Sequence, residues 1–89
     1  MSRLDKADCY ARDDEQKRRW SLAASALIKS RLVLARMSYR DLQHALADMG
    51  YVQHANTIAT KLSRGGYSAA FFLMCLRATG TTSIDLPRE

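Results

Sequence analysis

Apolar positions recur at three- and four-residue steps along most of the chain, which is the period of an amphipathic α-helix. The first such run follows the acidic stretch "DDEQ" and predicts a helix over residues 13–36, about 36 Å long. Its apolar positions are Trp20, Ala23, Ala24, Leu27, Ile28, Leu32, Leu34 and Ala35. Because this length exceeds what a compact helical domain needs, its first half is expected either to project or to fold over another element.

The next two predicted helices are short and carry clear start and stop signals. Ser38 is a predicted N-cap with Asp41 at the capping-box position, and Gly50 ends the second helix. The third helix is predicted over residues 54–63, before two consecutive glycines. Its expected core positions are Ala55, Ile58, Ala59 and Leu62.

The fourth predicted helix lies between Ser68 and Gly80 and is apolar on every side, so it needs cover on every side. Tyr67 is expected to pack on Phe71 as a hydrophobic staple. The predicted core face is the one that carries Phe72, Leu73 and Leu76, or its neighbour. The rest is expected to meet either the long first helix or a second subunit, with dimer contacts at Trp20, Phe71 and Met74.

Length and topology limit the architecture to one all-α domain. With 89 residues, no internal repeat and four helices, the chain is expected to form a compact four-helix helix-turn-helix domain with a long first helix. The predicted organisation is a flexible leader of residues 1–12, the domain over residues 13–80 and a C-terminal tail of residues 81–89 with a short extended segment. A core this small is marginal, which favours a homodimer.

Charge and cysteine content indicate a basic intracellular protein. The formal net charge is +5, and residues 20–80 hold seven basic and two acidic side chains, a balance that suits a polyanionic partner. Cys9 and Cys75 form neither a disulfide framework nor a metal-ligand spacing. The chain has no signal-peptide pattern and no apolar run of membrane-spanning length, so a cytoplasmic location is expected.

The second and third predicted helices together suit a helix-turn-helix, in which the first helix crosses the phosphates and the second enters the major groove of DNA. One face of the third helix anchors in the core, and the opposite face is polar and basic. Expected base contacts are Gln53, Asn56, Thr57, Thr60, Lys61 and Arg64. Expected phosphate contacts are Ser38, Arg40 and Gln43.

Two resemblances accompany these helices. "SYRDLQHALADMG" and "ANTIATKLSRG" resemble the lambda-repressor-like (Xre-type) helix-turn-helix families over residues 24–80, although the turn "GYVQHANT" is about two residues longer than usual. "RRW", "ALIKSRL", "SYRDLQ" and "KLSRGGYSAAFFLMCLRATG" more closely resemble a bacterial family of small uncharacterised helical proteins, a domain of unknown function. This second resemblance covers residues 20–80, implies a regulator-like fold and brings no established chemistry.

The expected function is sequence-specific binding of double-stranded DNA by a homodimeric transcriptional regulator. The alternative is a helical protein-interaction module, an adaptor or an antitoxin-like partner, without nucleic-acid binding. His44 and His54 lack further ligands at metal-binding spacing, and no nucleophile, base and orienting group can be assembled. We therefore expect no enzyme, metal, cofactor, small-molecule substrate or membrane partner. The sequence does not distinguish DNA from RNA.

Overall fold

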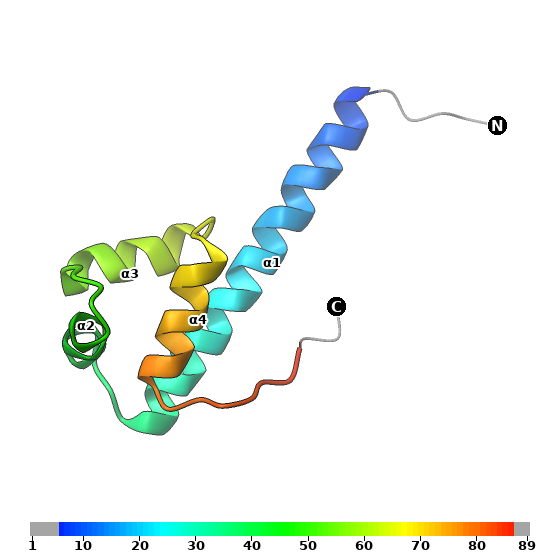
Figure 1. Ribbon diagram of the computed structural model, residues 1–89. Helices are drawn as coiled ribbons and strands as arrows, with labels where there is room; N and C mark the ends of the chain where they lie inside the picture. The colour runs from blue at the N-terminus through cyan, green and yellow to red at the C-terminus, as the bar shows by residue number, and fades with distance from the viewer. Residues whose placement is uncertain (1–5, 87–89) are drawn as a thin grey trace.

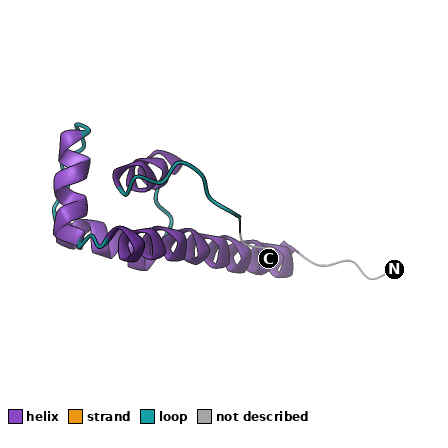
Figure 2. Ribbon diagram, turned by 90° about the horizontal axis from the view of Figure 1, so that it is seen from below, coloured by secondary structure: helices purple, strands orange, loops and turns teal. Residues whose placement is uncertain are grey.

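The computed structural model describes residues 6–86, with side chains from residue 13 onward. This part of the chain forms four helices and no strand: α1 (Lys6–Ala35), α2 (Tyr39–Asp48), α3 (Ala55–Arg64) and α4 (Ala69–Ala78). The three short helices gather around the C-terminal half of α1, while its N-terminal half extends beyond them (Figure 1). Figure 2 shows the same projecting helix from below. The predicted all-α fold is confirmed.

The long first helix begins earlier than predicted. It starts at Lys6, so the expected flexible leader overlaps the helix, and residues 1–5 lie outside the described part of the chain. Its N-terminal half projects and does not fold over α4, leaving residues 13–20 exposed at every position. Of the apolar positions predicted on this helix, Ile28 and Leu32 are buried, whereas Leu34 and Trp20 are exposed.

Helix ends follow the local signals in the sequence. The predicted capping box of α2 is confirmed: the Asp41 N–H donates to Ser38 Oγ (3.1 Å), and the Ser38 N–H donates to Asp41 Oδ2 (2.9 Å). At the end of α1, the Met37 N–H donates to the carbonyl of Leu32 while the Arg36 N–H donates to that of Val33, a Schellman motif. The same bond pattern ends α2 and α4.

The core is formed by nine buried side chains from all four helices. They are Ile28, Leu32, Leu42, Leu46, Ile58, Leu62, Phe71, Cys75 and Leu76. The helix α1 packs on α3 and α4, and α2 packs on the same two helices. Beyond α4 the tail forms no strand within residues 79–86, and Ile84 packs against the core.

The structure decides which side of α4 faces the core. Phe71, Cys75 and Leu76 are buried, whereas Leu73 is 62% exposed and Phe72 is half-buried. Of the two faces that the sequence left open, the neighbouring one is buried, since an unbroken apolar run gives no periodicity from which a face can be chosen. Phe71 is only 2% exposed, so its predicted place at a dimer interface was wrong.

A buried polar bridge joins α1, α3 and the loop before α4. Ser25 Oγ donates to the carbonyl of Leu62 (2.7 Å) and lies 2.8 Å from the Tyr67 hydroxyl. Because Ser25 has one hydroxyl proton, Tyr67 donates to Ser25. Nearby, a Cβ on Gly65 would lie 2.8 Å from Ser21 Cβ, so this position needs a glycine for α3 and α1 to approach closely.

None of the four helices combines the length and the apolar character needed to cross a bilayer, as far as the described residues go.

Candidate nucleic-acid interface

The helix α3 divides into a buried apolar face and an exposed polar face, as predicted. Ile58 and Leu62 are buried, and Ala55 and Ala59 are half-buried. The exposed face contains no acidic residue, and its polar members are Asn56, Thr57, Thr60, Ser63 and Arg64. His54 caps the helix, with Nδ1 accepting a hydrogen bond from the Asn56 N–H (3.0 Å).

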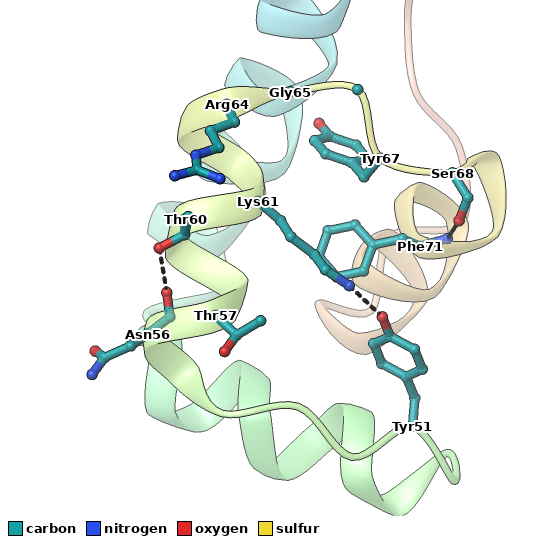
Figure 3. Close-up of a pocket in the computed structure, with 11 residues that line it drawn as sticks. Tyr51, Asn56, Thr57, Thr60, Lys61, Arg64, Gly65, Tyr67, Ser68 and Phe71 are labelled. Atoms are coloured by element: carbon teal, nitrogen blue, oxygen red, sulfur yellow. Dashed lines mark hydrogen bonds between the residues drawn. The ribbon is translucent and has the colours of Figure 1, made fainter.

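An open hollow of about 660 Å³ lies beside this face, between α3 and the start of α4 (Figure 3). It is lined by Tyr51, Asn56, Thr57, Thr60, Lys61, Arg64, Gly65, Gly66, Tyr67, Ser68 and Phe71. The lining contains two cationic side chains and no carboxylate, and several hydroxyl groups border it. The hollow is therefore suited to an anionic group.

Lys61 turns into the hollow and away from the outer edge of α3. Its ammonium donates to the Tyr51 hydroxyl (2.8 Å) and lies 5.0 Å from the centroid of the Phe71 ring. This arrangement, visible in Figure 3, combines a hydrogen bond with a cation–π contact. Lys61 therefore differs from the other expected base-contacting residues, because its charge is fixed between α3 and two aromatic rings.

Three aromatic rings build the wall that supports Lys61. The Tyr67 and Phe71 rings meet edge to face at 5.1 Å, which confirms their predicted packing, and the Tyr51 and Phe71 rings lie 6.0 Å apart. Sequence reasoning missed Tyr51. The available signal was its place directly after Gly50, the second position beyond the C-cap Met49, where an apolar side chain commonly packs back on the helix.

The expected phosphate contacts lie at the start of α2, and two of them have structural roles. Gln43 Oε1 accepts the Ala55 N–H (2.9 Å), which ties α2 to the first turn of α3. The Ser38 hydroxyl accepts within the capping box. Arg40 is exposed one turn before Gln43, and Gln53 is half-buried in the turn between the helices. Of the expected phosphate contacts, the structure thus brings Gln43 next to the N-terminal end of α3.

Cys75 is the one cysteine among residues 13–86, and it lies in the core. Burial raises the pKa of the Cys75 thiol to about 12, so this thiol stays protonated and unreactive. Within residues 6–86 no three His, Cys, Asp or Glu side chains come close enough to hold a metal ion.

The other two predicted dimer contacts do not form a continuous surface with Phe71. Trp20 borders a shallow depression with Tyr67, and Met74 is half-buried against the core. The exposed apolar side chains are concentrated instead on α1, where Leu22, Val33 and Leu34 are exposed.

A family model described as a domain of unknown function (DUF6471) matches residues 20–84, and the chain belongs to this family. This agrees with the expected membership of a small uncharacterised family. No curated protein and no solved structure matches the chain. The expected likeness to lambda-repressor-like domains therefore stays a prediction.

Proposed function

We propose that this member of the DUF6471 family binds double-stranded DNA sequence-specifically, as a homodimer, and regulates transcription. The observation that supports this most is the exposed face of α3, which is polar, free of acidic residues and joined to a hollow with two cations and no carboxylate. Phosphate contacts by such groups supply most of the affinity of DNA-binding proteins.

In this proposal the residues divide into base-reading and phosphate-binding sets. Asn56, Thr57, Thr60 and Arg64 are exposed along one side of α3 and offer donors and acceptors to base edges in the major groove. Lys61, held in the hollow by Tyr51, supplies positive charge for a backbone phosphate. Arg40 and the free amide nitrogen of Gln43 extend this contact onto α2, as the first helix of a helix-turn-helix does.

The proposal is tested by fluorescence anisotropy of labelled DNA duplexes titrated with the protein over a series of salt concentrations. The duplexes are drawn from a random library by selection on the protein. Affinity should fall steeply with salt, and Lys61→Ala should weaken binding to all duplexes and reduce the salt slope by about 0.9. Loss of a base contact by Arg64→Ala should instead cost about 1–3 kcal/mol of discrimination at one base position.

Arg77→Ala is the matched control, since Arg77 is an exposed cation on α4 and outside the lining of the hollow. It should leave affinity, salt slope and discrimination unchanged. Equal losses for Arg77→Ala and Lys61→Ala would mean that only total charge matters and would contradict the assignment to α3. Absence of salt-dependent binding to DNA duplexes would refute the proposed function. Stronger binding to duplex RNA than to duplex DNA would show that the partner is RNA.

One observation supports the second candidate function, a helical protein-interaction module. The exposed apolar side chains of α1 offer a surface on which another helix could dock. Apolar docking changes little with salt, whereas binding to DNA weakens, so the same salt series separates the two functions.

A further inference from the structure

The hollow between α3 and α4 presents hydrogen-bond donors that the protein itself does not use. The Lys61 ammonium has three N–H groups, and one of them donates to the Tyr51 hydroxyl (2.8 Å). Because that hydroxyl accepts from Lys61, its own proton is free to donate. Among residues 13–86 the Arg64 guanidinium has no hydrogen-bond or ion-pair partner. Both cations at the hollow therefore keep donors for a ligand.

Two further hydroxyls at the hollow keep an unused proton. The Ser68 hydroxyl accepts from the Phe71 N–H (3.1 Å) as the cap of α4, and the Thr57 hydroxyl makes no hydrogen bond to the described part of the chain. The lining includes no carboxylate, and its one side-chain carbonyl, that of Asn56, points away from Lys61 (Figure 3). The hollow thus offers donors and positive charge without a counter-charge of its own.

Lys61 keeps its charge in a half-buried place. Its ammonium lies 5.0 Å from the centroid of the Phe71 ring and 5.5 Å from that of the Tyr51 ring. A cation–π contact and one hydrogen bond to a neutral hydroxyl compensate only part of the hydration that a charge loses on burial. An anion bound in the hollow would supply the missing negative partner.

We infer that the hollow binds a free phosphate monoester. A terminal phosphate carries a charge of about −1.5 to −2 at neutral pH and three strong acceptor oxygens. This charge matches the two cations of the lining, and the oxygens match the unused N–H and O–H donors around them. A phosphodiester of a nucleic-acid backbone has a single charge and fewer terminal oxygens, so it would engage fewer of these groups.

The hollow also has room for the organic part of such an ester. Its volume of about 660 Å³ falls within the range of about 300–1,000 Å³ that is common for small-molecule sites. Behind Lys61 the wall is aromatic, with the Tyr67 and Phe71 rings edge to face at 5.1 Å. Small-molecule sites commonly combine apolar walls of this kind with a few polar groups that fix the ligand.

The inference rests on the proposed function only in its consequence for DNA. A bound ester and a backbone phosphate would both use the Lys61 ammonium, so they would compete for it. The ester would then lower the affinity for duplexes and act as a regulatory ligand of the same site. Its binding to the protein alone does not require that the protein bind DNA.

The test is an NMR titration of the isotope-labelled full chain without DNA, at neutral pH and constant ionic strength. Methyl phosphate is the probe for a free monoester, and dimethyl phosphate is the probe for the backbone linkage. The amide signals of Lys61, Gly65 and Ser68 should shift with methyl phosphate along a single saturating curve. Dimethyl phosphate should bind several-fold more weakly, because it carries less charge.

Variants of the lining show whether the hollow is the site. Lys61→Met removes the ammonium and keeps the aliphatic chain, and it should weaken binding of methyl phosphate by about tenfold or more. Tyr51→Phe, which keeps the ring and removes the hydroxyl that accepts from Lys61, should also weaken binding. Lys29→Met is the matched control, since Lys29 is exposed on α1 and outside the lining of the hollow, and it should leave binding unchanged.

Three results would overturn the inference. Equal binding of the two esters would show that the hollow does not select a monoester over a backbone phosphate. A methyl phosphate titration without shifts at the hollow would show that the ester does not bind there. Equal weakening by Lys61→Met and Lys29→Met would show that only total charge matters.

Anisotropy titrations of duplexes with and without methyl phosphate separate this inference from the proposed function. The wild type should bind duplexes more weakly when methyl phosphate saturates the hollow at constant ionic strength. A protein that binds methyl phosphate but no duplex refutes the proposed function and leaves the inference intact. Duplex binding by a protein that does not bind methyl phosphate refutes the inference and leaves the function intact.

Discussion

At the residue scale, a single serine hydroxyl connects three parts of the fold. Ser25 is 2% exposed, donates to the carbonyl of Leu62 in the last turn of α3 and accepts from Tyr67. The carbonyls in the last turn of a helix have no partner within the helix, so the serine satisfies a group that would otherwise be buried and unpaired. The same bridge fixes the loop that bears Tyr67, and with it one wall of the hollow.

Removing this hydroxyl should therefore destabilise the protein. Ser25→Ala is expected to lower the free energy of unfolding by about 1–3 kcal/mol, because the buried Leu62 carbonyl loses its partner. The measurement is equilibrium unfolding in urea, monitored by circular dichroism. Ser30→Ala serves as the control, since that exposed hydroxyl bonds within its own helix, and it should be nearly neutral. Equal effects in the two variants would show that the bridge does not contribute specifically.

At the element scale, three of the four helices end in the same motif with different residues in the left-handed position. Gly50 and Gly80 occupy it after α2 and α4, and Arg36 occupies it after α1 with φ 56°. A side chain in this conformation costs about 1–2 kcal/mol. The turn from α1 into α2 therefore stores strain that the other two helix ends avoid.

Arg36→Gly should relieve this strain. We expect a net gain of about 1 kcal/mol, since the greater freedom of glycine in the unfolded chain offsets part of the relief. Thermal unfolding should show a rise of about 4–8 °C in Tm. The reverse change, Gly50→Ala, should lower Tm, because alanine is strained at the positive φ of this position. The added Cβ would meet no atom within 4 Å, so the loss would come from the backbone conformation alone. A lower Tm for Arg36→Gly would show that the arginine side chain stabilises the fold by more than its backbone strain costs.

The capping box of α2 should make stability depend on pH. Hydrogen bonds from the Ser38 backbone and side chain lower the pKa of Asp41 below its ordinary value of 3.8. A lowered folded-state pKa contributes stability that is complete above the ordinary value and is lost as the pH falls through the lowered one. The Tm difference between wild type and Asp41→Asn should therefore shrink as the pH is lowered from 7 to about 2. A Tm difference that stays constant with pH would contradict a stabilising role for the negative charge of Asp41.

The sequence was sufficient for features that depend on neighbouring residues and insufficient for those that depend on packing. The caps at Ser38 and Ser68 follow from local backbone geometry, and the buried face of α3 follows from its period. The buried face of α4 could not be chosen within a continuous apolar run. The direction of Lys61 depends on Tyr51, ten residues away and across a turn, so no local pattern predicts it.

At the scale of the whole molecule, polar and apolar exposed groups lie on different helices. The helix α3 and the hollow beside it carry exposed polar groups and two cationic side chains, and α1 contributes exposed apolar side chains. A substitution among the exposed apolar side chains of α1 can therefore be made without changing the exposed face of α3. This separation lets the effect of such a substitution on duplex binding be compared directly with that of a substitution on α3.

The order in which the helices pack has a consequence for biosynthesis. Within the described residues, α1 takes its main contacts from α3 and α4 rather than from α2, which follows it in the chain. Of these four helices α1 is made first, and like α2 it must wait for α3 and α4. Its buried side, which carries Ile28 and Leu32, is completely covered only after translation has passed residue 78, so α1 is the first of these helices that a chaperone acting on the growing chain would meet.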